Sequence, residues 1–120
     1  MNTSPRIVIL GAGFAALTAV RELRRRLPKA RLTLVAPKAE FVFLPSLIWI
    51  PSGLRKGSDL VQPLAGFLDK HQVEFIPGRV TGLRDGGRTV LTDAGEVSND
   101  ALIIATGGRF IKKLPGIEHA

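Results

Sequence analysis

The segment at residues 11–16 reads Gly-Ala-Gly-Phe-Ala-Ala and matches the pattern G-x-G-x-x-G/A. It follows an aliphatic run and opens a stretch with the apolar spacing of a helix. In this setting Gly11 allows a tight turn, Gly13 lets a pyrophosphate approach the backbone, and Ala16 lets the helix pack close to the strand. The helix would direct its unpaired N–H groups and its positive dipole end at the phosphates. A glycine turn that serves packing only is the alternative, and the flanking pattern favours a dinucleotide site.

The acidic residue that usually binds the ribose hydroxyls is missing from its expected position. It should lie about 20 residues further on, at the end of the second strand, and Ala36 stands there. The nearest carboxylate is that of Glu40, and the sequence leaves open whether it reaches back to the ribose. Lys38 would suit a 2′-phosphate, whereas a solvated loop lysine is the simpler interpretation.

The elements around the glycine turn predict a β-α-β unit over residues 6–36. Residues 6–10 and 31–35 are β-branched and aliphatic runs, typical of strands buried on both faces of a parallel sheet. The helix between them begins at Phe14 and is stopped by Pro28. The crossover should be right-handed, which makes the two strands parallel neighbours.

A different composition follows. Residues 41–57 are rich in proline and aromatic residues without a clean period, which predicts a long ordered loop. Within it, Trp49 could face a membrane, a quinone or the core, and we favour the core or a buried interface. The apolar spacing from Leu60 to Leu68 predicts a second, shorter helix that reaches about His71.

Short strand patterns fill the rest of the chain. A third strand is expected at residues 73–76, and a small antiparallel meander at about 78–98, because turn signals separate its short runs. An apolar closing strand covers residues 100–107. The fold class is therefore α/β: a Rossmann-like parallel sheet with a small inserted antiparallel meander, incomplete at the C-terminus.

Composition narrows the functional classes. The net charge of +7 raises nucleic acid, an anionic membrane surface or phosphate-bearing ligands as partners. The one dense basic run, residues 24–26, stands at the end of the predicted helix, where cations suit the dipole and solvent, so we predict no specific nucleic-acid partner. The absence of cysteine excludes disulfides, thiolate metal sites and thiol redox chemistry within these residues. Without a secretory signal or a run of about 20 apolar residues, we expect a cytoplasmic chain.

In its order of motifs the chain resembles the FAD-dependent pyridine nucleotide–disulfide oxidoreductases over essentially all of its length. The resemblance is carried by the glycine turn, the proline-aromatic loop, the meander and the Ala-Thr-Gly at residues 105–107. In that superfamily the last motif belongs to a second FAD fingerprint, here residues 100–107. The loop sequence Phe-Leu-Pro-Ser-Leu-Ile-Trp-Ile-Pro-Ser-Gly-Leu-Arg at residues 43–55 resembles most closely the sulfide:quinone oxidoreductase branch. Type II NADH:quinone oxidoreductases share the plan with a different loop.

The resemblance implies FAD as the cofactor and assigns its contacts. The candidate cofactor-binding residues are Gly11, Gly13, Phe14 and Ala15 at the pyrophosphate, Ala36 at the ribose position, Val80 with the backbone of Arg79 at the adenine, Ala105, Thr106 and Gly107 beside the flavin linker, and Pro45 and Ser46 near the ring. The residues show no paired carboxylates, metal-ligand cluster or Ser/His/Asp set, so we predict neither catalytic residues nor a metal site.

As a whole protein, the resemblance implies electron transfer through bound FAD from sulfide to a quinone, at the cytoplasmic membrane as a peripheral protein. The redox-active cysteines, the second nucleotide-binding fold and the membrane-associating helices of such relatives would lie beyond Ala120, so the 120-residue chain is expected to bind without turnover. An NADH-oxidising flavoenzyme is one alternative. A non-catalytic nucleotide-binding or interaction module, suggested by Ala36, is the other. We also expect self-association through an uncovered strand edge.

Overall fold

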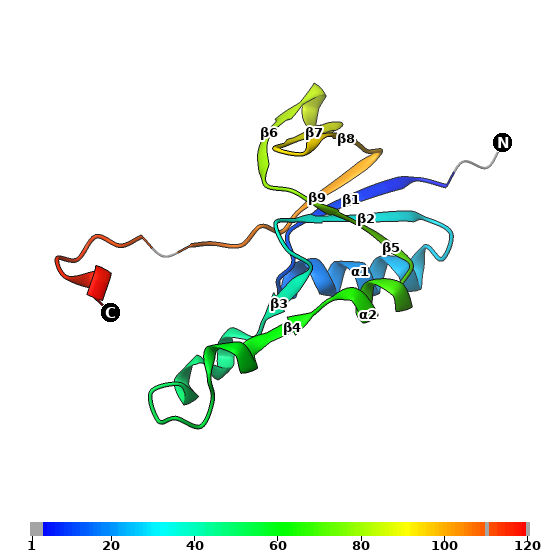
Figure 1. Cartoon of the computed structure of the whole chain (residues 1–120). Helices are drawn as coiled ribbons and strands as arrows, with labels where there is room; N and C mark the ends of the chain where they lie inside the picture. Colours follow the sequence, from blue (N-terminus) through cyan, green and yellow to red (C-terminus); the bar gives the residue numbers. More distant parts are fainter. Residues whose placement is uncertain (1–3, 110, 120) are drawn as a thin grey trace.

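A computed structural model describes residues 4–109 and 111–119 and shows the predicted α/β architecture (Figure 1). A four-stranded parallel sheet carries two helices on one face and a three-stranded antiparallel meander on the other. In chain order the strands and α-helices are β1 (Arg6–Leu10), α1 (Phe14–Arg26), β2 (Arg31–Ala36), β3 (Glu40–Val42), β4 (Val61–Pro63), α2 (Ala65–Lys70), β5 (Val73–Pro77), β6 (Val80–Arg84), β7 (Thr89–Thr92), β8 (Gly95–Ser98) and β9 (Ala101–Ile104).

The parallel sheet has the strand order β5-β2-β1-β9. Central strand β1 pairs with β2 from Arg6, opposite Arg31, to Leu10, opposite Val35, and it pairs with β9 along its other side. Every residue of β1 after Arg6 is buried, as expected for a strand covered on both faces. Because all four strands run the same way, their carboxyl ends meet at one edge of the sheet.

Alternate residues of β1 and β2 build two cores, because successive side chains of a strand point to opposite faces. On the helix face, Ile9 and Leu34 pack against Ala16 and Val20 of α1 and against Leu64 and Leu68 at α2. On the meander face, Val8, Leu10 and Val35 pack against Val90 and Val97. Burying an aliphatic side chain of this size stabilises a fold by about 1.5–3 kcal/mol. The meander is therefore an integral cover of the sheet.

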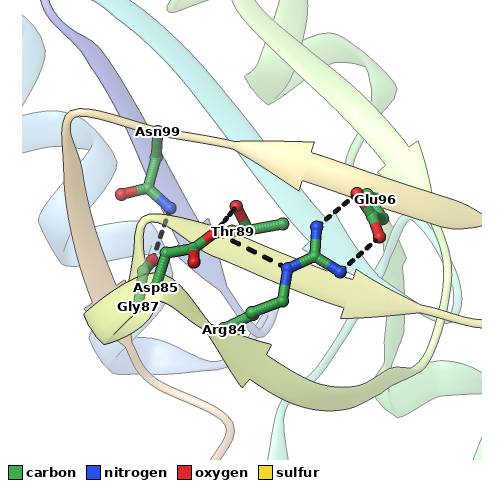
Figure 2. A network of polar contacts seen from close by, with 6 residues as sticks. All are labelled: Arg84, Asp85, Gly87, Thr89, Glu96 and Asn99. Carbon is green, nitrogen blue, oxygen red and sulfur yellow. Dashed lines mark hydrogen bonds and ion pairs between the residues drawn. The ribbon is translucent and has the colours of Figure 1, made fainter.

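Polar contacts fix the shape of the meander (Figure 2). The guanidinium of Arg84 donates two hydrogen bonds of 2.9 Å to the carboxylate of Glu96, across the three strands. At the other end, the buried amide of Asn99 donates to the carbonyl oxygen of Gly87 at 2.8 Å. The exposed pair contributes little to stability, whereas the buried one ties the meander to the start of β9.

The second helix is shorter than the sequence pattern predicted. Leu60 ends the 3₁₀ helix η2 (Gly57–Leu60), β4 follows, and α2 begins only at Ala65. The physical reason is Pro63, which has no N–H to donate and disfavours helical conformation in the residue before it. The chain instead pairs β4 with β3, antiparallel, with Glu40 opposite Pro63.

The segment predicted as a loop contains regular structure. It includes most of β3 and the 3₁₀ helix η1 (Leu44–Trp49), and it projects from the sheet as an arm (Figure 1). Trp49 does not pack in the core of the described chain, since 45% of the residue is exposed, and Ile48 is 70% exposed. The alternative expectation, that Trp49 lies at a buried interface, stays a prediction. Apolar composition alone favoured burial, and no described element covers this arm.

The three arginines at the end of α1 make different contacts. Arg24 turns inward, and its guanidinium donates to the carbonyl oxygens of Pro28, Ala30, His71 and Gln72 at 2.8–3.0 Å. It thereby ties the chain that follows α1 to the residues that follow α2. The solvated role expected for all three arginines is therefore wrong for Arg24.

Arg25 and Arg26 keep the solvated role. Both are exposed and donate to the carboxylate of Glu22, at 2.7 and 3.1 Å. The hydrogen bond from Arg25, followed by that from Arg26, lowers the pKa of Glu22 from its ordinary value. Ion pairs on an exposed helix face are screened by solvent and contribute little to the stability of the fold.

Candidate functional site

The glycine turn joins β1 to α1 at the carboxyl edge of the sheet. Gly11 has a φ of +115°, and a side-chain carbon placed on it would lie 2.1 Å from the carbonyl oxygen of Ala105. The N–H of Gly11 donates to the carbonyl oxygen of Val35 at 2.8 Å, and the N–H of Ala105 donates to the carbonyl oxygen of Leu10 at 2.9 Å. Both backbone conformation and packing therefore require glycine at position 11. The two sequence motifs, at residues 11–16 and 105–107, meet here.

Gly13 differs from Gly11. Its φ of −92° and ψ of −165° are extended and open to any residue. A side-chain carbon placed on it would meet no heavy atom of the described residues within 4 Å. Neither the backbone nor the packing of the described chain accounts for glycine at position 13, and the space beside it is open to a ligand.

The start of α1 is uncapped within the described residues. Gly13 is the N-cap residue, and the described residues give it no side-chain cap hydrogen bond and no acidic residue in the first turn. The first intrahelical bond runs from the N–H of Leu17 to the carbonyl oxygen of Gly13 at 3.0 Å. The N–H groups of the first turn thus lack helical acceptors and carry the positive end of the helix dipole.

A cleft of about 770 Å³ opens beside this turn, at the carboxyl ends of β1, β2 and β5. This volume lies within the range of small-molecule sites. Its lining residues are Gly11, Ala12, Val35, Ala36, Pro37, Lys38, Glu40, Val42, Gly78, Arg79, Val80, Thr106 and Arg109. The lining carries the cations Lys38, Arg79 and Arg109 and, among the described residues, the single carboxylate of Glu40.

The structure brings some of the predicted site residues together in this cleft. Gly11, Ala36, Val80 and Thr106 line it, although they come from four separate segments. Ala36 is nearly buried, at 3% exposure, and offers no side-chain polar group to a ligand. Its carbonyl oxygen accepts a hydrogen bond of 3.0 Å from the N–H of Gly78, which extends the pairing of β2 and β5 to the carboxyl ends of both strands.

Other predicted residues lie outside the lining. They are Gly13, Phe14 and Ala15 at the start of α1, Pro45 and Ser46 in η1, and Ala105 and Gly107 after β9. Phe14 makes edge-on contacts with the rings of Phe41 and Phe43, at centroid distances of 4.9 and 5.9 Å. This aromatic cluster connects the start of α1 to the base of the projecting arm. Residue 107 has a φ of +69°, a conformation that favours glycine.

Sequence reasoning missed several lining residues. Arg109 follows the Gly-Gly pair after β9, and no periodic signal marks a residue in such a segment. Val42 belongs to β3, which the proline-aromatic composition concealed. Pro37 and Gly78 lie at strand ends, and the rule that ligands bind outside the carboxyl ends of parallel strands could have found them.

A second cleft of about 780 Å³ lies at the opposite edge of the sheet. It is lined by the amino ends of the strands, including Arg6, Arg31 and Glu74. Ligands of doubly wound sheets bind outside the carboxyl ends of the strands. The first cleft also adjoins the glycine turn and the start of α1, so it is the candidate site.

Residues 4–109 and 111–119 contain no cluster of three or more His, Cys, Asp or Glu side chains placed to hold a metal ion. Within the same residues, no helix combines the length and the apolar character that crossing a membrane requires.

Comparison with known proteins places these features in a wider group. The family described as pyridine nucleotide-disulphide oxidoreductase matches residues 5–120. The sulfide-quinone reductase of Aquifex aeolicus is 31% identical over 114 residues, which are 94% of this chain and 26% of that protein. A type II NADH:quinone oxidoreductase of Staphylococcus epidermidis is 31% identical over 122 residues, covering 96% of this chain and 30% of that protein.

The fold is shared as well. The crystal structure of the sulfide:quinone oxidoreductase from Aquifex aeolicus matches with a TM-score of 0.86 and 30% identity, over 96% of this chain and 27% of that one. The chain thus spans between 26% and 30% of the length of these relatives.

Proposed function

Because the chain belongs to the pyridine nucleotide-disulphide oxidoreductase family, we propose that it binds the ADP half of FAD as part of a flavin-dependent oxidoreductase. The observation that carries this proposal is the open space at Gly13. A glycine that the fold does not require, at the N-cap of an uncapped helix, is explained by a ligand whose phosphates must approach the backbone.

The residues of the cleft fit an adenine nucleotide. The N–H groups at the start of α1 would hold the pyrophosphate, with Gly13 leaving room for it and Phe14 and Ala15 in the first turn. Val80 and the backbone of Arg79, at the start of β6, line the same cleft and would hold the adenine. Thr106 lies in the cleft on the side of β9, where the nucleotide would continue toward the flavin, with Ala105 and Gly107 beside it and Pro45 and Ser46 at the ring.

FAD, when bound, supplies the transfer of electrons between a donor and an acceptor. The residues of this chain bind and orient it: Gly11 brings the two motifs together, and the buried sheet keeps the turn in place. The described residues offer no acid, base or nucleophile arranged for catalysis. We therefore propose that the 120-residue chain binds the cofactor without turning over substrate.

For the whole protein we propose oxidation of sulfide with a quinone as acceptor, as a peripheral protein of the cytoplasmic membrane. The support is the likeness to the sulfide-quinone reductase of Aquifex aeolicus in sequence and fold, together with the loop sequence at residues 43–55. Oxidation of NADH is the second candidate, since the type II NADH:quinone oxidoreductase of Staphylococcus epidermidis is equally identical to this chain. Anaerobic mixing of a longer protein that carries this chain with sulfide, and separately with NADH, distinguishes them by which donor bleaches the flavin.

We propose in addition that the chain self-associates. In the part of the chain that the structure describes, β9 pairs only with β1, and β5 pairs only with β2, so both strands are edges. Ile104, in β9, is 62% exposed. An unpaired edge with an exposed apolar residue is a template for pairing with another chain.

The proposed nucleotide site is tested by titrating the chain with FAD in a calorimeter and repeating the titration with Gly13→Val. Saturable binding that the variant abolishes would support the site. Binding that is unchanged in a correctly folded variant would show that the nucleotide does not lie at the start of α1.

A further inference from the structure

Strand β3 presents Glu40 to the cleft. Side chains alternate along a strand, and in β3 the ring of Phe41 packs against the helix-face core while Glu40 and Val42 line the cleft. The strand is fixed by its pairing with β4, where Glu40 lies opposite Pro63. The position of Glu40 therefore follows from the fold of the described chain.

Contacts to α1 place Glu40 near the proposed pyrophosphate site. Its neighbour Phe41 makes an edge-on contact with Phe14, the first residue of α1, at a centroid distance of 4.9 Å. On the other side of Glu40, the carbonyl oxygen of Ala39 accepts a hydrogen bond of 2.9 Å from the N–H of Leu64. The carboxylate of Glu40 is thus carried by a backbone that is anchored on both sides.

The chemistry of the lining singles out this carboxylate. The two hydroxyls of a ribose need hydrogen-bond acceptors. Dinucleotide-binding folds with this glycine turn usually carry an acid at the position of Ala36, whose side chain has no acceptor. Among the described lining residues, the only other side chain with an oxygen is that of Thr106. No ion pair within residues 4–109 and 111–119 engages Glu40, so its oxygens are available to a ligand.

We propose that Glu40 binds the ribose hydroxyls of the adenine nucleotide, four positions later in the chain than the missing acid at Ala36. This inference rests on the nucleotide-binding function proposed above. A carboxylate at this point accepts from a free 2′,3′-diol and repels a 2′-phosphate. The site therefore selects nucleotides with an unmodified adenosine ribose, and Lys38 does not act as a 2′-phosphate ligand.

The test is calorimetric titration of the 120-residue chain with ADP, 2′-deoxy-ADP and ADP carrying a 2′-phosphate. The unmodified chain should bind ADP about tenfold more tightly than 2′-deoxy-ADP, because 2′-deoxy-ADP lacks the 2′-hydroxyl that would donate a hydrogen bond to the carboxylate of Glu40. Glu40→Ala should bind ADP and 2′-deoxy-ADP equally. Glu22→Ala, which removes an exposed carboxylate of α1 away from the cleft, should keep the tenfold preference.

The outcomes separate this inference from the function on which it rests. If ADP binds and Glu40→Ala keeps the preference for the 2′-hydroxyl, the role of Glu40 is wrong and the nucleotide site stands. The proposed role of Glu40 would also be overturned if the unmodified chain bound ADP with a 2′-phosphate more tightly than ADP. If ADP and FAD both fail to bind the folded chain, the proposed function fails and this inference fails with it. The thermal unfolding temperature of each variant checks that the substitution, at an exposed residue, leaves the fold intact.

Discussion

Gly11 and Gly13 lie two positions apart in one turn, and only Gly11 is held to glycine by the protein itself. A side chain on Gly11 would collide with the carbonyl oxygen of Ala105, whereas a side chain on Gly13 would meet no heavy atom of residues 4–109 and 111–119 within 4 Å. The fold therefore requires the first glycine, and we propose that the second leaves room for a ligand. This division makes the stability and the binding of the chain separately testable.

We expect Gly11→Ala to destabilise the fold strongly. The matched control is Gly95→Ala, because Gly95 has a similar φ of +126° and open space around it, so that only backbone strain is added. The control should lose about 1–3 kcal/mol of unfolding free energy. Gly11→Ala should lose about 1–3 kcal/mol more, or fail to fold, because of the added collision. Urea unfolding followed by circular dichroism measures both, and equal losses would contradict the close approach to Ala105.

We expect Gly13→Ser to keep the fold and lose the nucleotide. Serine is a good N-cap residue and should leave the unfolding free energy within about 0.5 kcal/mol of the original or raise it. Its side chain would occupy the space that we propose for the pyrophosphate and should reduce FAD affinity by at least about tenfold, or 1.4 kcal/mol. Thermal unfolding and calorimetry on the same sample report the two effects. Unchanged affinity would remove Gly13 from the site.

Much of this fold could be predicted because the sequence pattern and the local physics agree. The buried runs of β1 and β2, the helix between them and the glycine turn all have short-range signals. The meander was predicted from its turns in the same way. The pairing of β3 with β4 was not, since two strands of three residues inside a proline-aromatic segment leave no period to detect. Pro63 was a readable signal that the second helix could not start at Leu60.

The candidate site was predicted less completely, because its lining comes from segments that meet only in three dimensions. The glycine turn predicts where the phosphates lie, and the absence of an acid at Ala36 left the ribose contact open. That Glu40 lines the same cleft depends on the alternation of β3, which could not be anticipated without knowing the strand. Arg109 lies in an irregular segment after β9, and it lines the cleft because that segment passes beside it.

Arg24 should contribute to stability far more than its neighbour Arg25. Arg24→Met leaves four backbone carbonyls without their cationic donor and should cost about 2 kcal/mol. Arg25→Met removes one exposed ion pair with Glu22 and should leave the free energy of unfolding almost unchanged. Chemical unfolding of the two variants gives the comparison. Similar costs would show that the inward contacts of Arg24 do not stabilise the connection between the helix ends.

The edge strand β9 should support self-association that a charge can block. We expect the sedimentation coefficient of the chain to rise with concentration. Ile104→Lys places a charge on the exposed edge and should keep the chain monomeric over the same range. A chain that sediments as a monomer at high concentration would contradict the proposal. Ile111→Lys, an exposed apolar residue after the sheet, is the matched control and should leave association unchanged.

The measurement that tests the central claim most directly is a parallel calorimetric titration of the chain with FAD, NAD and NADP. The structure of the turn, the cleft at the carboxyl edge and the family of the chain together predict saturable binding with FAD preferred over both pyridine nucleotides. Preference for NAD or NADP, or the absence of FAD binding by a chain shown to be folded, would contradict the proposal that this cleft holds the ADP half of FAD.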